Sequence, residues 1–182
     1  MLNEQIFIFS KKGQIVDTPP GGSKVEVTLI TDLREWSKIS AEFFAEVNTH
    51  RVLGFDAEWV TDKASGIVRK TALIQLATHR GWVVLFRLNR LGSIPKDLIP
   101  VLEDETVLKL GVGVSKDAKK LKKDYGVEMM GSRSLDALAA RLRPGKPPVG
   151  LSALASEFLG VKMDKSKEVS SLVAFLETLN SQ

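Results

Sequence analysis

Short apolar runs separated by turn-prone residues dominate the first half of the chain, a pattern that is typical of β-strands. Apolar and polar residues alternate over residues 25–30, and further strand-like runs cover residues 51–60, 71–77 and 82–86. The connections between the last three runs are short, and a parallel return needs a dozen residues or more. We therefore expect these three strands to form an antiparallel meander.

A helix is expected between the first strand and the second. Asp32 is followed three residues later by Glu35, a pairing in which each side chain bonds backbone N–H groups at the start of a helix. Apolar residues then recur at helical spacing, at Leu33, Trp36, Ile39 and Phe43.

The second half of the chain changes to an alternation of strands and helices. Strands are expected at residues 107–112 and 127–130. Helices are expected at residues 95–102, 115–125, 135–142 and 151–159. The order of elements predicts an α/β fold with a mixed sheet, three antiparallel meander strands followed by parallel strands, flanked by helices.

Length and composition restrict the class of protein. With 182 residues, of which 43% are hydrophobic and 26% charged, the chain is expected to form one domain around a single core. No run approaches the ~20 apolar residues of a membrane span, and the basic start and cleavage site of a secretory signal are missing. We therefore expect an intracellular protein that does not span a membrane, with nucleus, cytoplasm and mitochondrion left open.

The chain contains no cysteine and two histidines, His50 and His79. Disulfides, thiolate zinc sites and cysteine nucleophiles are therefore excluded, and a histidine-based metal site is not expected. A bound metal would have to be held by carboxylates, which favour hard cations such as Mg²⁺ or Mn²⁺. The net charge of +4 is compatible with a polyanionic partner but does not require one.

Asp56 and Glu58 are the most informative acidic residues of the first half. Because side chains on a strand alternate between faces, both should project from the same side of an otherwise apolar strand. Two carboxylates at this spacing repel each other and are costly to bury unpaired, and a divalent cation between them would relieve both penalties. The alternative is an edge strand with a solvated acidic face.

A second acidic position follows the glycine-rich turn between the strand at residues 107–112 and the next helix. Asp117 lies in the first turn of that helix, where the helix dipole favours an acid, so its role could be limited to capping. The glycines do not indicate a dinucleotide site, since Gly111 and Gly113 are followed by Lys116 where the third glycine of that motif would stand.

The order and spacing of these segments resemble a known family. Asp56 and Glu58 within Phe-Asp-Ala-Glu-Trp, Gln75 within Ala-Leu-Ile-Gln-Leu-Ala, and Val112-Gly113 with Asp117 resemble the DEDD 3′-5′ exonucleases. The similarity is greatest to the DEDDy-type, Werner-like and RNase D-like branch, especially the eukaryotic exonuclease 3′-5′ domain-containing proteins. It covers residues 25–168, preceded by a preamble at residues 1–24 that ends in a Pro-Pro-Gly-Gly linker.

The resemblance implies an RNase H-like fold and a two-metal exonuclease mechanism. In this family four carboxylates from three motifs bind two Mg²⁺ or Mn²⁺ ions, so Asp56, Glu58 and Asp117 would be both catalytic residues and metal ligands. Trp59 and Leu76 would contact the terminal base, although such side chains more often belong to a core. Lys116 and Lys120 would contact phosphates of the nucleic acid, with a solvated helix exterior as the alternative.

The family's third motif, a Tyr with an Asp four residues later, is missing from this sequence. The one tyrosine is Tyr125, and Met129 stands four residues after it. Residues 169–182 instead predict an amphipathic helix that replaces the motif. Three other acids are candidates for the fourth ligand, but each has a simpler explanation. Asp136 would cap a helix, Asp164 lies in a segment that the family does not use for metal, and Glu177 would face water.

Two hypotheses of different class follow. The first is a 3′-5′ exonuclease acting on DNA or RNA, severely impaired or inactive in this chain because the fourth carboxylate is missing; a shortened or alternatively spliced product would explain this. The second is a catalytically inactive relative that binds nucleic acid or a protein partner. A small-molecule enzyme is disfavoured because the sequence has neither a Gly-x-Ser-x-Gly elbow nor a phosphate-binding loop. The oligomeric state is left open.

Overall fold

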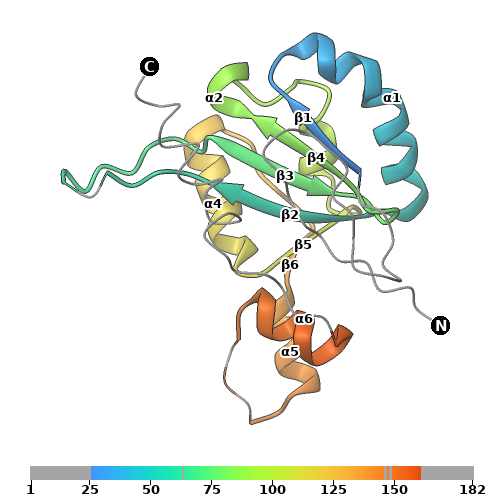
Figure 1. Cartoon of the computed structure of the whole chain (residues 1–182), viewed down its shortest axis with the longest axis vertical. Helices are drawn as coiled ribbons and strands as arrows, with labels where there is room; N and C mark the ends of the chain where they lie inside the picture. The colour runs from blue at the N-terminus through green and yellow to red at the C-terminus, as the bar shows by residue number, and fades with distance from the viewer. Residues whose placement is uncertain (1–25, 63, 146, 148, 161–182) are drawn as a thin grey trace.

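A six-stranded mixed sheet flanked by helices forms the body of the molecule (Figure 1). The computed structural model describes residues 26–62, 64–145, 147 and 149–160. The strands are β1 (Glu26–Ile30), β2 (Val52–Glu58), β3 (Leu73–Ala77), β4 (Trp82–Arg87), β5 (Leu108–Gly111) and β6 (Ser132–Ser134). The helices are α1 (Leu33–His50), α2 (Leu88–Leu91), α3 (Ile99–Glu103), α4 (Val114–Tyr125), α5 (Leu135–Leu142) and α6 (Leu151–Leu159).

The sheet combines a central meander with parallel strands, as the sequence predicts. Its strand order is β1-β4-β3-β2-β5-β6, in which β2, β3 and β4 are antiparallel neighbours. Strands β5 and β6 extend the sheet beyond β2 in parallel. Strand β1 pairs in parallel with β4 at the opposite edge, a neighbour that the local pattern did not identify.

The main core lies on one face of the sheet. Alternate residues of β2, including Phe55 and Ala57, belong to one buried cluster with Phe43 of α1 and Leu121 of α4. The opposite face carries a smaller buried cluster of Leu73, Val83 and Leu85. Figure 1 shows α1 along the β1 edge, whereas α5 and α6 form a pair beyond β6. Among the described residues no helix is both long and apolar enough to cross a membrane.

The start of α1 follows the predicted capping arrangement. The Asp32 Oδ1 atom accepts hydrogen bonds from the N–H groups of Arg34 and Glu35, at 2.7 and 3.1 Å. In return, the Glu35 Oε2 atom accepts one from the N–H of Asp32 at 3.1 Å. These bonds satisfy orphan donors at the helix N-terminus, which is why two polar residues three apart determine where α1 begins.

The prediction of a strand at residues 127–130 is wrong. Val127 and Met129 are buried in the main core, and the N–H of Met130 donates to the Leu102 carbonyl oxygen at 3.1 Å. The segment therefore packs under the end of α3, and strand pairing with β5 begins afterwards, at β6. Its alternation of buried and exposed side chains imitates a strand, because burial against any flat surface produces the same two-residue period.

The helix boundaries also differ in one region. The helix expected at residues 95–102 is confined to α3, four residues later, and α2 was not expected at all. The Asp97 carboxylate is instead bound by the Trp36 Nε1–H at 2.8 Å, a tertiary contact that no local pattern reveals. The expected helix at residues 169–182, residues 1–24 and the acids Asp164 and Glu177 lie outside the described residues.

Lys109 is fully buried in β5, under the end of α3. Its Nζ donates to the carbonyl oxygens of Asp104, at 2.8 Å, and Val101, at 3.2 Å. A cation near a helix C-terminus satisfies orphan carbonyls and complements the helix dipole. Burial lowers the pKa of Lys109 to about 8, which shows how strongly this ammonium is removed from water.

Candidate active site

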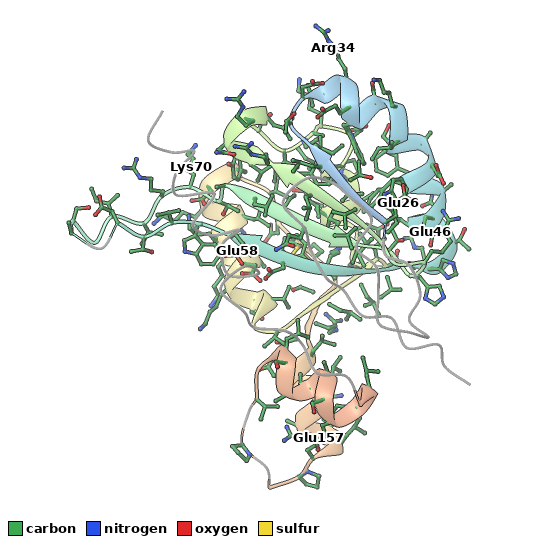
Figure 2. All side chains as sticks on the ribbon, viewed as in Figure 1. Glu26, Arg34, Glu46, Glu58, Lys70 and Glu157 are labelled. Atoms are coloured by element: carbon green, nitrogen blue, oxygen red, sulfur yellow. The ribbon has the colours of Figure 1, made fainter. Side chains whose placement is uncertain are left out.

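Strand β2 presents Asp56 and Glu58 on one face of the sheet. The neighbouring residues Phe55 and Ala57 are buried in the main core. On the other face of the strand, Asp56 is exposed and Glu58 is half-buried. The common face expected from strand alternation is therefore confirmed. Figure 2 shows the Glu58 side chain at the end of β2, beside α4.

Gly111 determines how closely the element that carries Asp117 approaches β2. Strand β5 lies parallel to β2, and a Cβ built on Gly111 would stand 2.4 Å from the Phe55 carbonyl oxygen. A side chain at this position would therefore push the strands apart. The chain then turns through Gly113, whose φ of +71° favours glycine, and α4 begins.

Asp117 is buried, with 7% of its surface exposed, in the first turn of α4. In the described structure no side-chain hydrogen bond caps the start of this helix, where Gly113 is the N-cap residue. The capping role that the sequence left open for Asp117 is therefore not what holds it in place. The close approach of β5 to β2 instead brings its carboxylate into electrostatic contact with Asp56 and Glu58.

The three carboxylates disfavour one another's ionisation. Burial, together with the charges of Asp56 and Asp117, raises the pKa of Glu58 to about 7. Burial and the charge of Asp56 raise the pKa of Asp117 to about 6, with Lys116 acting in the opposite direction. Partial removal from water also raises the pKa of Asp56, although this side chain keeps exposed surface. Such perturbed carboxyls, gathered from two elements, are typical of functional sites.

Gln75 is a neighbour of the site for which the local sequence pattern predicts no role. It lies directly opposite Asp56 in the pairing of β3 with β2, and its Nε2 donates to Asp56 Oδ2 at 3.0 Å. This bond engages the Oδ2 atom of Asp56 and does not involve its Oδ1 atom. The signal that could have identified Gln75 is its register, which requires knowing how the two strands pair.

Trp59 and Lys120 are both half-buried and lie against each other. The Lys120 Nζ lies 5.6 Å from the centroid of the Trp59 ring, donates to the Arg69 carbonyl oxygen at 2.8 Å and pairs with Asp124. With only 11% of its side chain exposed, Lys120 joins α4 to the segment before β3. Its contact with a nucleic acid stays a prediction, and the bonds observed here are structural.

Leu76 and Lys116 lie in different environments. Leu76 is fully buried in the main core, on the face of the sheet opposite Asp56, and packing accounts for its position. Lys116 is exposed on α4 next to Asp117, where its charge lowers the pKa of that carboxyl. The base contact of Leu76 and the phosphate contact of Lys116 stay predictions, and Lys116 has the more accessible position.

The donor set suits a hard divalent cation. Within the part of the chain that the structure describes, no group of three or more His, Asp or Glu side chains is close enough to hold a metal ion as it stands. The carboxylates of Asp56, Glu58 and Asp117 are nevertheless coupled and mutually repulsive, and a divalent cation would remove that repulsion. The residues fit Mg²⁺ or Mn²⁺ by their chemistry, in an open arrangement that has three carboxylates.

The Glu58→Gln substitution is expected to raise the melting temperature of the metal-free chain at about pH 8. The folded-state pKa of Glu58, about 7, lies above its ordinary value of 4.5, so ionisation costs stability as the pH rises between them and the full cost remains above pH 7. Removing that cost should stabilise the fold by about 1–3 kcal/mol. Thermal unfolding in a chelator, measured at about pH 8 and at about pH 5, tests this expectation.

The stabilisation by Glu58→Gln should shrink at about pH 5, where the folded chain already keeps Glu58 protonated. Glu26→Gln is the matched control, since Glu26 is exposed on β1, three strands away from β2. Figure 2 places Glu26 and Glu58 at different ends of the sheet. Equal stabilisation at both pH values would contradict the electrostatic explanation.

Comparison with known proteins finds similarity to 3′-5′ exonucleases. A family model described as a 3′-5′ exonuclease matches residues 35–177. Exonuclease 3′-5′ domain-containing protein 2 of Drosophila melanogaster is 44% identical over 117 residues, 64% of this chain and 19% of that protein. The protein of the same name from Homo sapiens is 38% identical over 149 residues, 79% of this chain and 24% of that protein. The chain thus spans about a fifth to a quarter of the length of these relatives.

Solved structures of an exonuclease domain have a fold similar to that of this chain. The crystal structure of the EXD2 exonuclease domain superposes with a TM-score of 0.60 at 30% identity, covering 85% of this chain and 84% of that one. The same domain soaked in Mn superposes with a TM-score of 0.61 at 30% identity, covering 85% of this chain and 86% of that one. The mixed sheet and its flanking helices therefore form an RNase H-like fold.

Proposed function

Because the chain belongs to the 3′-5′ exonuclease family, we propose that it acts on the 3′ end of a nucleic acid strand and hydrolyses the terminal phosphodiester bond with the help of divalent metal ions. The observation that carries this proposal is the meeting of Asp56 and Glu58 from β2 with Asp117 from α4. No thiol and no hydroxyl nucleophile motif competes with these carboxylates for a catalytic role.

Asp56, Glu58 and Asp117 would hold the metal. Bound there, a divalent cation would supply Lewis acidity, lowering the pKa of the attacking water and stabilising charge at the leaving 3′ oxygen. Gln75 keeps Asp56 oriented through its hydrogen bond. The EXD2 exonuclease domain has been soaked in Mn and in Mg, and in Mn with GMP or dGMP, which supports the same metals and a nucleic acid substrate for this chain.

A second candidate function is binding of a nucleic acid without cleavage. The observation that favours it is the absence from the sequence of a Tyr with an Asp four residues later, the motif that would complete the carboxylate set. Three carboxylates hold metal less tightly than four, and the water-orienting tyrosine is missing as well. On the first candidate function this chain should therefore cleave slowly, and on the second it should bind a nucleic acid without cleaving it.

The test is the cleavage of a 5′-labelled oligonucleotide in Mn²⁺, comparing the wild-type chain with Asp56→Ala. We expect slow shortening from the 3′ end by the wild-type chain and no shortening by the variant, because Asp56 supplies a metal-binding oxygen. The products should form a ladder of single-nucleotide steps. DNA and RNA substrates of the same sequence should be compared, since the site itself does not discriminate between them.

Two controls make the cleavage result interpretable. Lys96→Ala, at an exposed position before α3, should cleave as the wild-type chain does. Circular dichroism should show that Asp56→Ala remains folded. A folded wild-type chain that binds the oligonucleotide in Mn²⁺ but never shortens it would reject the exonuclease proposal and leave binding without cleavage as the function.

A further inference from the structure

A pocket of about 400 Å³ opens where β3 begins, near the end of β2 that carries Glu58. Its walls come from the segment before β3, from α2 and from the last residue of α4. The lining residues with polar or aromatic groups are Arg69, Lys70, Thr71, Asn89 and Tyr125. None of them has a role in the proposed chemistry of the carboxylates.

The wall formed by Tyr125 is fixed by hydrogen bonds. The Tyr125 hydroxyl donates to the Thr71 carbonyl oxygen at 2.6 Å. The N–H and Oγ1–H of Thr71 both donate to Asp124 Oδ2, at 2.7 and 2.9 Å. Lys120 pairs with the same carboxylate. The half-buried aromatic ring is thus held at the pocket before any ligand arrives, which lowers the entropic cost of binding against it.

The rim of the pocket is positively charged. Arg69 and Lys70 are both exposed, and the Lys70 Nζ lies 5.6 Å from the centroid of the Tyr125 ring. Two acids are nearby. The Asp124 carboxylate is already bonded to Lys120 and Thr71, and the half-buried Asp62 is close enough for Arg69 to influence its ionisation. Cations beside an aromatic face are the combination with which proteins bind single-stranded nucleic acids.

The pocket lies near the end of β2 that carries Glu58, but its residues Leu88 and Tyr125 pack on the main-core face, so a strand that reaches both sites would pass around the end of β2. The N–H of Ala72, a pocket residue, donates to the Glu58 carbonyl oxygen at 2.8 Å. Helix α4 begins near the carboxylate site with Asp117 and ends at the pocket with Tyr125, which corresponds to about 12 Å along the helix axis. Stacked nucleotides of about 3.4 Å each would cover that distance in three to four steps. Figure 2 shows Lys70 and Glu58 toward the same end of the sheet, with Glu157 far from both.

We propose that this pocket binds a single-stranded nucleic acid about three to four nucleotides before its 3′ end, with Arg69 and Lys70 on the phosphates and Tyr125 against a base or sugar. The inference rests on the proposed function, which places the 3′ end at Asp56, Glu58 and Asp117. It adds a second contact region, so that binding strength depends on strand length and not only on the terminal nucleotide.

The test uses the double charge reversal Arg69→Glu with Lys70→Glu. Fluorescence anisotropy in Ca²⁺ would measure binding of labelled oligothymidylate and oligouridylate of about eight nucleotides, and of the matching dinucleotides. We expect the variant to bind the long strands about tenfold more weakly and to bind the dinucleotides as the wild-type chain does. The slope of log affinity against log salt should become shallower by about 1.4, or about 0.7 for each lost phosphate contact.

The matched control is Arg34→Glu with Lys38→Glu, which changes the net charge equally at exposed positions of α1. Figure 2 shows Arg34 at the tip of α1, away from Lys70. Equal weakening by both double variants would overturn the proposal, because loss of general charge would then explain the effect. Unchanged binding by the pocket variant, or no binding of either long strand by the wild-type chain, would overturn it as well.

Failure of the pocket and failure of the proposed function give different results. Cleavage that needs Asp56 but is indifferent to Arg69 and Lys70 at every strand length would keep the exonuclease and reject the pocket. Length-dependent binding that needs Arg69 and Lys70, in a chain that never cleaves, would keep the pocket and reject the exonuclease.

Discussion

The Asp117→Asn substitution is expected to lower the affinity for Mn²⁺ by at least about 100-fold and to remove the thermal stabilisation that Mn²⁺ gives to the wild-type chain. Asp117 is the one carboxylate of the site that α4 contributes, and its burial beside Asp56 makes it costly unless a cation is bound. At a Mn²⁺ concentration about 100 times the dissociation constant, the wild-type chain should gain about 2.7 kcal/mol. Thermal unfolding at increasing Mn²⁺ concentrations measures both quantities.

The affinity of the wild-type chain for Mn²⁺ should also rise with pH. Metal ligands must be deprotonated, and the pKa values of Glu58, about 7, and Asp117, about 6, lie above the ordinary range. Binding should therefore strengthen between about pH 5.5 and about pH 8 and then level off. Isothermal titration calorimetry at several pH values would follow this change.

Glu105→Gln is the control for the Mn²⁺ experiment. Glu105 is exposed and lies before the start of β5, whereas Asp117 follows the end of that strand. The control should bind Mn²⁺ as the wild-type chain does. If Asp117→Asn keeps the full Mn²⁺ stabilisation, the metal is held elsewhere and the assignment of Asp117 as a ligand is wrong.

Gly111→Ala is expected to destabilise the fold by about 3 kcal/mol and to lower the melting temperature by about 6–12 °C. The added Cβ would stand 2.4 Å from the Phe55 carbonyl oxygen, and backbone, unlike a flexible side chain, cannot move aside at low cost. Strand β5 must therefore shift from β2, and α4 with Asp117 shifts with it. The variant should lose Mn²⁺ affinity even at temperatures at which it remains folded.

Gly150→Ala serves as the control for the glycine experiment. Its φ is −75°, and an added Cβ would meet no atom within 4 Å. Alanine at this N-cap position of α6 should cost about 0.5–1 kcal/mol, well below the loss expected for Gly111→Ala. Comparable losses in the two variants would mean that general loss of glycine flexibility, and not the contact with Phe55, explains the effect of Gly111→Ala.

Local periodicity made part of the site predictable. Asp56 and Glu58 are two residues apart in an apolar strand, and the two-residue period of a strand is enough to put them on one face. Asp32 and Glu35 are equally local, since their bonds close within one helical turn. The inward side chains of α4, such as Leu121, follow from helical spacing in the same way.

Contacts between distant segments decided the remainder. Three contacts join residues that are far apart in sequence. They are the approach of β5 to Phe55, the bond from Gln75 to Asp56, and the contacts of Lys120 with the Arg69 carbonyl oxygen and the Trp59 ring. The sequence also gave no sign that Lys109, inside an apolar strand, would close the end of α3.

The sequence by itself thus determined the class of fold, the carboxylate chemistry and the common face of Asp56 and Glu58, because these depend on residue type and on spacing within one element. Only the tertiary structure decided that Asp117 lies close to them, that Lys120 is bound within the protein and that a basic pocket opens near the same end of β2. Those facts depend on which strands pair, in what register and how closely, and pairing is set by packing over the whole sheet.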